Sequence, residues 1–182
     1  MTTVRTIRPT QGLPPQIGAS IFALAGRVWP PEPGALDRDQ TLAQWKAQDS
    51  THCIIAQETH PHEVLAHALI FRREILTTQG SLPIGALATV CVHPDYRGRG
   101  WGEAVVRAAL GVMPEMAIAV SLFQTGVPQF YEKLGARIVN NRFFNGQNPD
   151  DSSNPFWDLE EMIYPAAFPW PEGDIDLNGE GY

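Results

Sequence analysis

The stretch from Val92 to Leu110, VHPDYRGRGWGEAVVRAAL, constrains the fold of this chain more than any other. Gly98, Gly100 and Gly102 fall within five residues, two arginines stand beside them, and an apolar run with helical spacing follows directly. The residues just before the stretch are mostly apolar, as in a strand that is buried on both faces. The sequence therefore predicts a buried strand, a glycine-rich loop and then a helix.

A loop in this position is suited to binding an anion. The first N–H groups of a helix have no partner inside the helix, and together with the helix dipole they attract negative charge. Glycines allow a phosphate to approach the backbone closely, and Arg97 and Arg99 add positive charge. A pyrophosphate is the simplest ligand that this loop predicts.

Two common nucleotide-binding loops do not match this stretch. A Walker A loop requires Lys and then Ser or Thr after its last glycine, whereas Glu103 and Ala104 follow Gly102. A dinucleotide fingerprint requires G-x-G-x-x-G early in a βαβ unit, whereas these glycines are spaced G-x-G-x-G in mid-chain. Neither a P-loop nor a Rossmann fold is expected.

Length and charge restrict the class of protein further. The 182 residues suit one domain, and the net charge of −7 argues against a nucleic-acid partner. No apolar run approaches the roughly 20 residues of a membrane helix, and the N-terminus lacks the apolar centre of a signal peptide. A cytoplasmic location without a membrane partner is expected, with one domain over residues 1–166 and an acidic tail over 167–182.

The acidic residues gather at the C-terminal end. Nine acidic residues and no Lys or Arg follow Arg142. Two interpretations stay open: the negative segment serves solubility, or it forms a rim that attracts a cationic substrate.

Hydrophobic periodicity predicts an α/β fold with a mixed sheet, in the order βααβββαβαββ. No periodicity marks the tail. The predicted strands cover residues 3–9, 52–58, 63–76, 82–92, 116–123, 136–144 and 157–165, and the predicted helices cover 14–29, 37–48, 100–110 and 127–134.

The spacing R-x-x-G-x-G, filled by Arg97, Gly100 and Gly102 after VHPDY, resembles that of the GNAT superfamily of acyl-CoA-dependent N-acetyltransferases. QFYEKLGA, residues 129–136, strengthens the resemblance, which covers about residues 3–164 and includes the order of elements. It implies a GNAT-like, strongly twisted mixed sheet of about seven strands flanked by four helices.

The resemblance also implies a site for acetyl-CoA as co-substrate. The N–H groups of the loop would hold the pyrophosphate, and the preceding strand would pair with the pantetheine arm in a slot where it splays from the next strand. Val90 would donate its N–H to the thioester carbonyl, Val92 would face the next amide, and Cys91 would point away from the thioester. The implied co-substrate-binding residues are Val90, Cys91, Val92, Arg97, Gly98, Arg99, Gly100, Trp101, Gly102, Glu103 and Gln124.

Three positions bear on the implied chemistry. Tyr131 matches the family's tyrosine, which lies near the sulfur and can protonate the leaving thiolate; the alternative is a core aromatic residue. Gln124 stands where many members have Asn before the last helix. Ala86 occupies the position at which some members carry a glutamate base, so water leading to Glu58, His67 or the tail carboxylates is the alternative route for the amine proton.

The cysteines and histidines predict no metal site. Cys53 and Cys91 lie in apolar runs and suggest buried thiols. His60 and His62 lack an evident third ligand, and His67 is expected to be a hydrogen-bonded core histidine.

The predicted function is transfer of an acetyl or acyl group from acetyl-CoA to a primary amine of a small cationic molecule, by direct attack. A non-catalytic acyl-CoA-binding or regulatory module is the alternative, and acetylation of protein N-termini or lysines is a third. A small-molecule amine is the expected partner, and a homodimer is left open.

The tail, with its sequence WPEGDIDLNGEGY, loosely resembles the ends of nodulation-type acyltransferases and of aminoglycoside N-acetyltransferases. This resemblance implies that the tail folds over the acceptor site with Trp170 as its packing anchor. A disordered end is the alternative.

Overall fold

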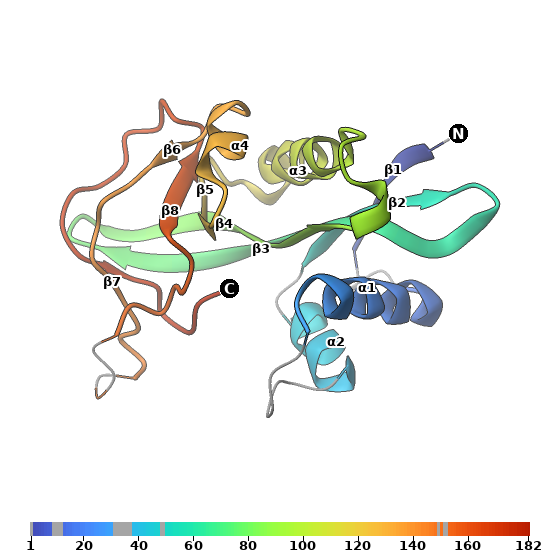
Figure 1. The fold of residues 1–182 in the computed structure, drawn as a ribbon. Coiled ribbons are helices and arrows are strands. Elements are labelled where there is room, and N and C mark those ends of the chain that lie inside the picture. Colours follow the sequence, from blue (N-terminus) through green and yellow to red (C-terminus); the bar gives the residue numbers. More distant parts are fainter. Residues whose placement is uncertain (1, 9–12, 31–37, 48–49, 149, 151–152) are drawn as a thin grey trace. The chain divides into compact units, whose positions relative to one another are not determined.

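The computed structural model describes residues 2–8, 13–30, 38–47, 50–148, 150 and 153–182 (Figure 1). This part of the chain holds four α-helices and nine β-strands, so the α/β class and the four helices are confirmed. The helices are α1 (Pro15–Val28), α2 (Arg38–Ala47), α3 (Trp101–Gly111) and α4 (Pro128–Glu132). The strands are β1 (Thr2–Ile7), β2 (Thr51–Gln57), β3 (His60–Thr77), β4 (Gly80–Val92), β5 (Ser121–Thr125), β6 (Arg137–Ile138), β7 (Phe143–Phe144), β8 (Glu160–Tyr164) and β9 (Ile175–Asp176).

The chain divides into two compact units. The first contains Met1–Phe71 and Leu87–Val112, and the second contains Arg72–Ala86 and Met113–Tyr182. The long strands β3 and β4 each contribute residues to both units.

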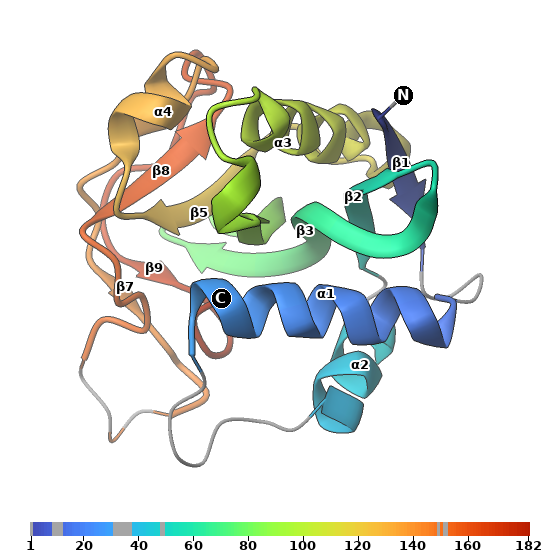
Figure 2. The ribbon, with the colours of Figure 1, turned by 45° about the vertical axis from the view of Figure 1, so that its right-hand side comes forward.

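In the first unit, β1 pairs antiparallel with β2, and β2 pairs antiparallel with β3. The β2–β3 register places Ile54 opposite His67 and His52 opposite Leu69. Helices α1 and α2 lie on one side of these strands and α3 lies on the other (Figure 2). Both faces of the strands are therefore covered, which explains why β2 is almost entirely buried.

The sequence determines α1 and α3 through their apolar faces. Pro15 begins α1, where a missing N–H costs nothing, and Ile17 and Ile21 recur at helical spacing and are fully buried. Helix α3 buries Val105 and Val106 in the same way. The structure differs from the predicted helix over 100–110 at its end, because α3 also includes Gly111.

In the second unit, β4 and β5 pair in parallel, at Gly85 with Ser121 and at Ala86 with Leu122. β8 pairs antiparallel with both β5 and β6, while β9 pairs antiparallel with β3 and parallel with β7. The sheet is thus mixed, as predicted. The buried core of this unit comprises Ile75, Ile84, Val120, Leu122, Val139, Phe143, Phe156, Ile163, Ile175 and Leu177.

Two of the predicted strands in this unit have different bounds. The strand expected over 116–123 begins only at Ser121, because Met113–Met116 form a 3₁₀ turn and Ala117 has a φ of 55°. The strand expected over 136–144 is two short strands, β6 and β7, which pair with different neighbours.

The tail belongs to the core of the second unit. Ile175 and Leu177 are fully buried, and Trp170 packs against the core and donates its Nε1–H to Asn141 Oδ1 at 2.7 Å. Residues 167–182 are therefore packed, and they include β9, which hydrophobic periodicity did not predict.

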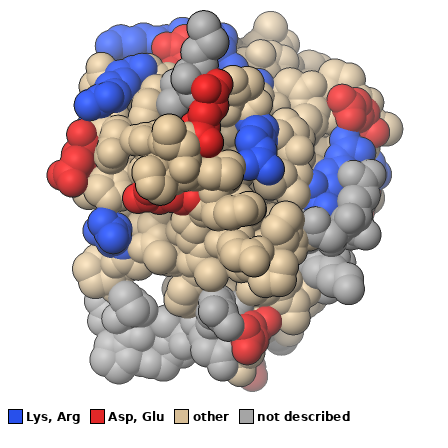
Figure 3. Space-filling model, turned by 90° about the vertical axis from the view of Figure 1, so that its right-hand side faces the viewer, with Lys and Arg blue, Asp and Glu red and all other residues tan. Residues whose placement is uncertain are grey.

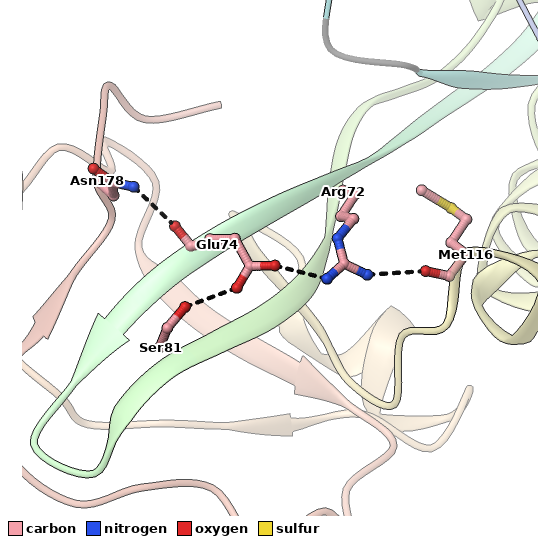
Figure 4. Close-up of polar contacts among 5 residues, drawn as sticks. All are labelled: Arg72, Glu74, Ser81, Met116 and Asn178. Atoms are coloured by element: carbon pink, nitrogen blue, oxygen red, sulfur yellow. Dashed lines mark hydrogen bonds and ion pairs between the residues drawn. The ribbon is translucent and has the colours of Figure 1, made fainter.

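The β3–β4 hairpin is held by a polar network in the second unit (Figure 4). Glu74 accepts hydrogen bonds from Arg72 at 2.7 Å and from Ser81 at 2.8 Å, and these two bonds lower its pKa. Arg72 also donates to the carbonyl of Met116, and Asn178 donates to the carbonyl of Glu74. The network thus joins the hairpin to the segment between α3 and β5, through Met116, and to the tail, through Asn178.

No helix in the described ranges is long and apolar enough to cross a membrane. On the face that Figure 3 shows, basic and acidic side chains are interspersed among uncharged ones. That face therefore does not present one sign of charge alone.

Candidate functional site

The loop before α3 has the backbone that its glycines predict. Gly98 and Gly100 have φ values of 77° and 75°, in the left-handed region that residues with a Cβ rarely adopt. Among the described residues, no atom lies within 4 Å of a Cβ built at either position, so the space that such a Cβ would fill is open. Gly100 is the N-cap of α3 and supplies no side chain to cap it. The first N–H groups of α3 therefore have no side-chain acceptor from the cap residue, as an anion site requires.

Three elements of the first unit fix the start of this loop. The N–H of His93 donates to the carbonyl of Leu65 in β3 at 2.8 Å, and Arg27 of α1 donates to His93 Nε2 at 2.8 Å. Gln57, at the end of β2, donates to the Tyr96 hydroxyl at 3.1 Å. The loop is thus anchored before its glycines, and sequence reasoning did not find the roles of Arg27 and Gln57.

The Arg99 side chain of the loop lies on a pair of stacked aromatic rings. Tyr96 and Trp101 stack with ring centroids 5.4 Å apart, and Arg99 Cζ lies 5.0 Å from the first ring centroid and 5.7 Å from the second. Cation–π contacts of this kind hold a guanidinium near its place. Arg97 and Arg99 are both exposed, so their charges are available to a ligand at the loop.

The end of β4 departs from regular strand geometry just before Val90. Thr89 has a φ of 46°, which is rare for a β-branched residue. Val90 and Val92 are half-buried, whereas Cys91 is 4% exposed and burial raises its pKa to about 12. Cys91 is therefore protonated at neutral pH and poorly suited to act as a nucleophile. The contacts of Val90, Cys91 and Val92 with the co-substrate stay predictions.

Tyr131 lies at the end of α4, in an aromatic cluster of the second unit. Its side chain is 6% exposed, and its ring centroid lies 4.6 Å from that of Phe123 and 4.8 Å from that of Phe130. Burial raises the pKa of Tyr131, and the negative charge of Asp158 raises it further. Its phenol therefore keeps its proton at neutral pH, which a general acid must do. Its role as that acid stays a prediction.

Gln124 holds the tail and the loop before β8. Its Oε1 accepts the N–H groups of Trp157 and Asp158, both at 2.8 Å, and its Nε2 donates to the carbonyl of Tyr182 at 2.8 Å. The position of Asp158 near Tyr131 therefore depends on Gln124. A contact of Gln124 with the co-substrate stays a prediction.

Two of the positions considered for the amine base, Ala86 and His67, lie in the core. Ala86 is fully buried and offers no base. His67 is also fully buried, both ring nitrogens lie in hydrogen bonds, and burial lowers its pKa to about 4. His67 is thus a core histidine, as predicted, and not placed to take a proton from a solvated amine.

Most tail carboxylates already have partners in the second unit. Asp174 pairs with Arg142 at 3.2 Å, Asp176 accepts two backbone N–H groups, and Glu180 accepts a hydrogen bond from Asn145. Much of the negative charge of the tail therefore serves to fix the tail itself.

Within the residues that the structure describes, no three His, Cys, Asp or Glu side chains gather as a metal ion would require. His60 Nδ1 lies 3.0 Å from the Thr59 hydroxyl.

The sequence model of one protein family, described as an acetyltransferase (GNAT) domain, matches residues 19–139, about two thirds of the chain. The chain belongs to this family. The GNAT family transfers acyl groups and uses acetyl-CoA as co-substrate, so the sequence-based resemblance is confirmed. No curated protein sequence matches the chain.

Several solved structures share the GNAT fold of this chain. An acetyltransferase from Trypanosoma brucei is 18% identical with a TM-score of 0.62, over 77% of this chain and 95% of that one. Glucosamine-6-phosphate N-acetyltransferase from Arabidopsis thaliana is 19% identical with a TM-score of 0.56, over 76% and 92%. A GCN5-related N-acetyltransferase from Kribbella flavida is 19% identical with a TM-score of 0.58, over 75% of this chain and 33% of that one. This chain thus spans a third of the length of the Kribbella protein, and these identities show the fold alone.

Proposed function

We propose that this chain transfers an acetyl group from acetyl-CoA to the primary amine of a small molecule, by direct attack of the amine. The observation that carries the proposal is the loop from Gly98 to Glu103. Three features of the loop support an anion site of the kind that a pyrophosphate needs: its two left-handed glycines, the α3 start that no cap side chain covers, and the exposed Arg97 and Arg99. This combination fits coenzyme A, the co-substrate of the family.

The bound thioester supplies an activated acetyl group, and the end of β4 orients it. In this proposal the Val90 N–H donates to the carbonyl oxygen as negative charge develops there, a role worth roughly 3 kcal/mol. The half-buried state of Val90 and Val92 and the left-handed backbone at Thr89 support an N–H aimed away from the regular sheet pairing.

Direct attack requires no nucleophile from the enzyme. The protonation state of the two cysteines is consistent with this mechanism. Burial raises the pKa of Cys53 to about 11 and that of Cys91 to about 12, so neither thiol is ionised at neutral pH. A covalent acyl-cysteine route would need a thiolate.

The leaving thiolate takes its proton from Tyr131. The raised pKa of this phenol keeps the proton in place until the thiolate forms. Because a thiol has a pKa of about 8–9, the thiolate leaves with only modest help from a proton donor, and the Tyr131 phenolate then regains a proton from solvent. The aromatic contacts with Phe123 and Phe130 hold the ring and so limit the directions its hydroxyl can take.

The proposed acceptor is a small cationic amine. The segment after Arg142 carries nine acidic residues and no basic one. Of these, Asp158 is exposed and close enough to Tyr131 to influence its pKa, and Gln124 fixes its backbone. Asp158 is therefore the carboxylate that we assign to the attraction of the amine, which loses its proton to water before attack.

One assay distinguishes the proposed acetyltransferase from a non-catalytic acyl-CoA-binding module. The protein is mixed with acetyl-CoA and a panel of monoamines, polyamines, amino sugars and lysine peptides, and release of free CoA thiol is followed. We expect amine-dependent thiol release that is strongest with small cationic amines. Tight acetyl-CoA binding with no thiol release above the amine-free control across the panel would favour the binding module.

A further inference from the structure

A chain of buried hydrogen bonds runs through the first unit to the irregular end of β4. The Ser50 hydroxyl lies 3.4 Å from His52 Nε2, His52 Nδ1 lies 2.9 Å from His67 Nε2, and His67 Nδ1 lies 3.0 Å from the carbonyl oxygen of Thr89. Ser50, His52 and His67 are each 0% exposed. His52 and His67 are diagonal neighbours on the β2–β3 ladder, and their rings stack with centroids 5.2 Å apart.

With both imidazoles neutral, as their burial favours, the carbonyl acceptor at the end of this chain fixes the direction of the histidine bonds. A carbonyl oxygen only accepts, so His67 donates from Nδ1 and its Nε2 is left as an acceptor. His52 therefore donates from Nδ1, and its Nε2 accepts from the Ser50 hydroxyl. Both imidazoles are neutral in this arrangement. Burial lowers the pKa of His52 to about 2 and that of His67 to about 4, so both stay neutral at physiological pH.

The residue that receives the last bond is strained. Thr89 is β-branched yet has a left-handed φ of 46° inside a strand. Its Oγ1 is buried and has no hydrogen-bond partner among the described residues. A backbone conformation of this kind persists only where its surroundings hold it, and such residues cluster at functional sites. Among these surroundings, His67 Nδ1 reaches the Thr89 carbonyl at 3.0 Å.

We propose that His67, supported by His52 and Ser50, is a positioning residue that fixes the left-handed backbone at Thr89 and thereby aims the Val90 N–H at the acyl carbonyl. This inference rests on the proposed function, because it gives the Val90 N–H a target. Since the Thr89 carbonyl and the Val90 N–H belong to the same peptide unit, fixing one fixes the direction of the other. His67 itself touches no reacting atom.

Kinetics of His67→Leu and His67→Asn test the proposal. Leucine removes the donor at similar volume, so kcat should fall about 10- to 100-fold, while the acetyl-CoA Kd measured by calorimetry stays within about twofold because the loop before α3 is intact. Asparagine carries an N–H donor near the place of His67 Nδ1, so it should restore most of kcat. Ile70→Ala is the control for general destabilisation, since Ile70 is fully buried in the same part of β3 and should lower Tm without lowering kcat at a temperature well below Tm.

A double-mutant cycle with Thr89→Gly makes the test specific. Glycine adopts a left-handed φ without strain, so the backbone no longer needs His67 to hold it. His67→Leu should therefore reduce kcat much less in the Thr89→Gly background than in the parent. Equal reductions in both backgrounds, or failure of His67→Asn to restore kcat above His67→Leu, would overturn the proposal.

A measurement independent of turnover separates this inference from the proposed function. The NMR carbon shifts of Thr89 report its backbone conformation, and the ring nitrogen shifts of His67 report which nitrogen carries the proton. We expect left-handed shifts at Thr89 in the parent and in His67→Asn, and extended shifts in His67→Leu. A parent without amine-dependent turnover would overturn the proposed function, whereas left-handed shifts in His67→Leu would overturn the positioning role alone.

Discussion

Tyr131 is the side chain that we propose protonates the leaving thiolate in the last step of the reaction. Tyr131→Phe removes the hydroxyl and keeps the ring that packs on Phe123 and Phe130. We expect kcat to fall by about 10²–10⁴, the usual contribution of a positioned acid. Acetyl-CoA affinity and Tm should change little. The rate is measured as thiol release under conditions in which chemistry limits turnover, and near-normal turnover would assign Tyr131 to the core instead.

The buried pair His52 and His67 predicts a pH dependence of folding stability. Their folded pKa values, about 2 and about 4, lie below the ordinary value of about 6.5 that the unfolded chain has. As pH falls from 6.5 toward 4, the unfolded chain binds protons that the folded chain excludes, so stability falls. Each pH unit in this window should cost up to about a factor of ten in the folding equilibrium constant for each histidine.

Denaturant unfolding at pH 7.5, 6.5 and 5 checks this dependence. The comparison between pH 6.5 and 5 isolates the histidines, because most carboxylates titrate lower. His52→Phe should show a shallower slope than the parent, since it removes one of the two groups. A parent with equal stability at pH 6.5 and pH 5 would show that the pair is not buried in its neutral form.

At the scale of elements, β9 is the segment that makes the tail part of the second unit. Ile175 is fully buried there, and it lies opposite Phe143 of β7 in the parallel pair. Ile175→Ala should destabilise the protein by about 2–5 kcal/mol, the usual cost of truncating a buried isoleucine. Glu172→Ala is the control, since Glu172 is exposed and should change stability by less than about 0.5 kcal/mol. An Ile175→Ala variant as stable as the parent in denaturant would mean that the tail adds nothing to the core.

Elements with clear periodicity could be predicted from the sequence, and short ones could not. The repeat of Ile17, Ile21 and Leu24 predicts α1 to within one residue at each end. The single strand predicted over 136–144 covers β6 and β7 but not the break between them, because each pairs with a different distant strand. A two-residue strand such as β9 is too short to contain a repeat. The tail strand was missed for this reason.

The candidate site also has a part that could be predicted from the sequence and a part that could not. The glycines of the loop before α3 are visible in the sequence, because a left-handed backbone demands them. The contacts of Arg27, Gln57 and His52 depend on strand register and helix placement, which the sequence does not state. Asp37, the first residue of the helix predicted over 37–48, lies outside the described residues.

At the scale of the whole molecule, the acidic composition raises the question of which carboxylates attract a cationic amine. Asp158→Asn should raise KM for a cationic amine about two- to fivefold, as an exposed ion pair contributes, and leave acetyl-CoA affinity unchanged. Asp174→Asn is the matched control, because Asp174 already pairs with Arg142. Added salt should reproduce part of the Asp158→Asn effect by screening. Equal KM values for Asp158→Asn and the parent would assign the acidic segment to solubility and tail packing.

The central claim is that the loop before α3 holds the pyrophosphate of acetyl-CoA, and calorimetry of two Gly100 variants tests it most directly. Asp and Asn both tolerate the left-handed backbone at Gly100 and have nearly the same size, but only Asp brings a negative charge to the site. We predict that Gly100→Asn weakens acetyl-CoA binding modestly and that Gly100→Asp weakens it at least about tenfold further, with both variants folded. Equal acetyl-CoA affinity in Gly100→Asp and Gly100→Asn would contradict the account.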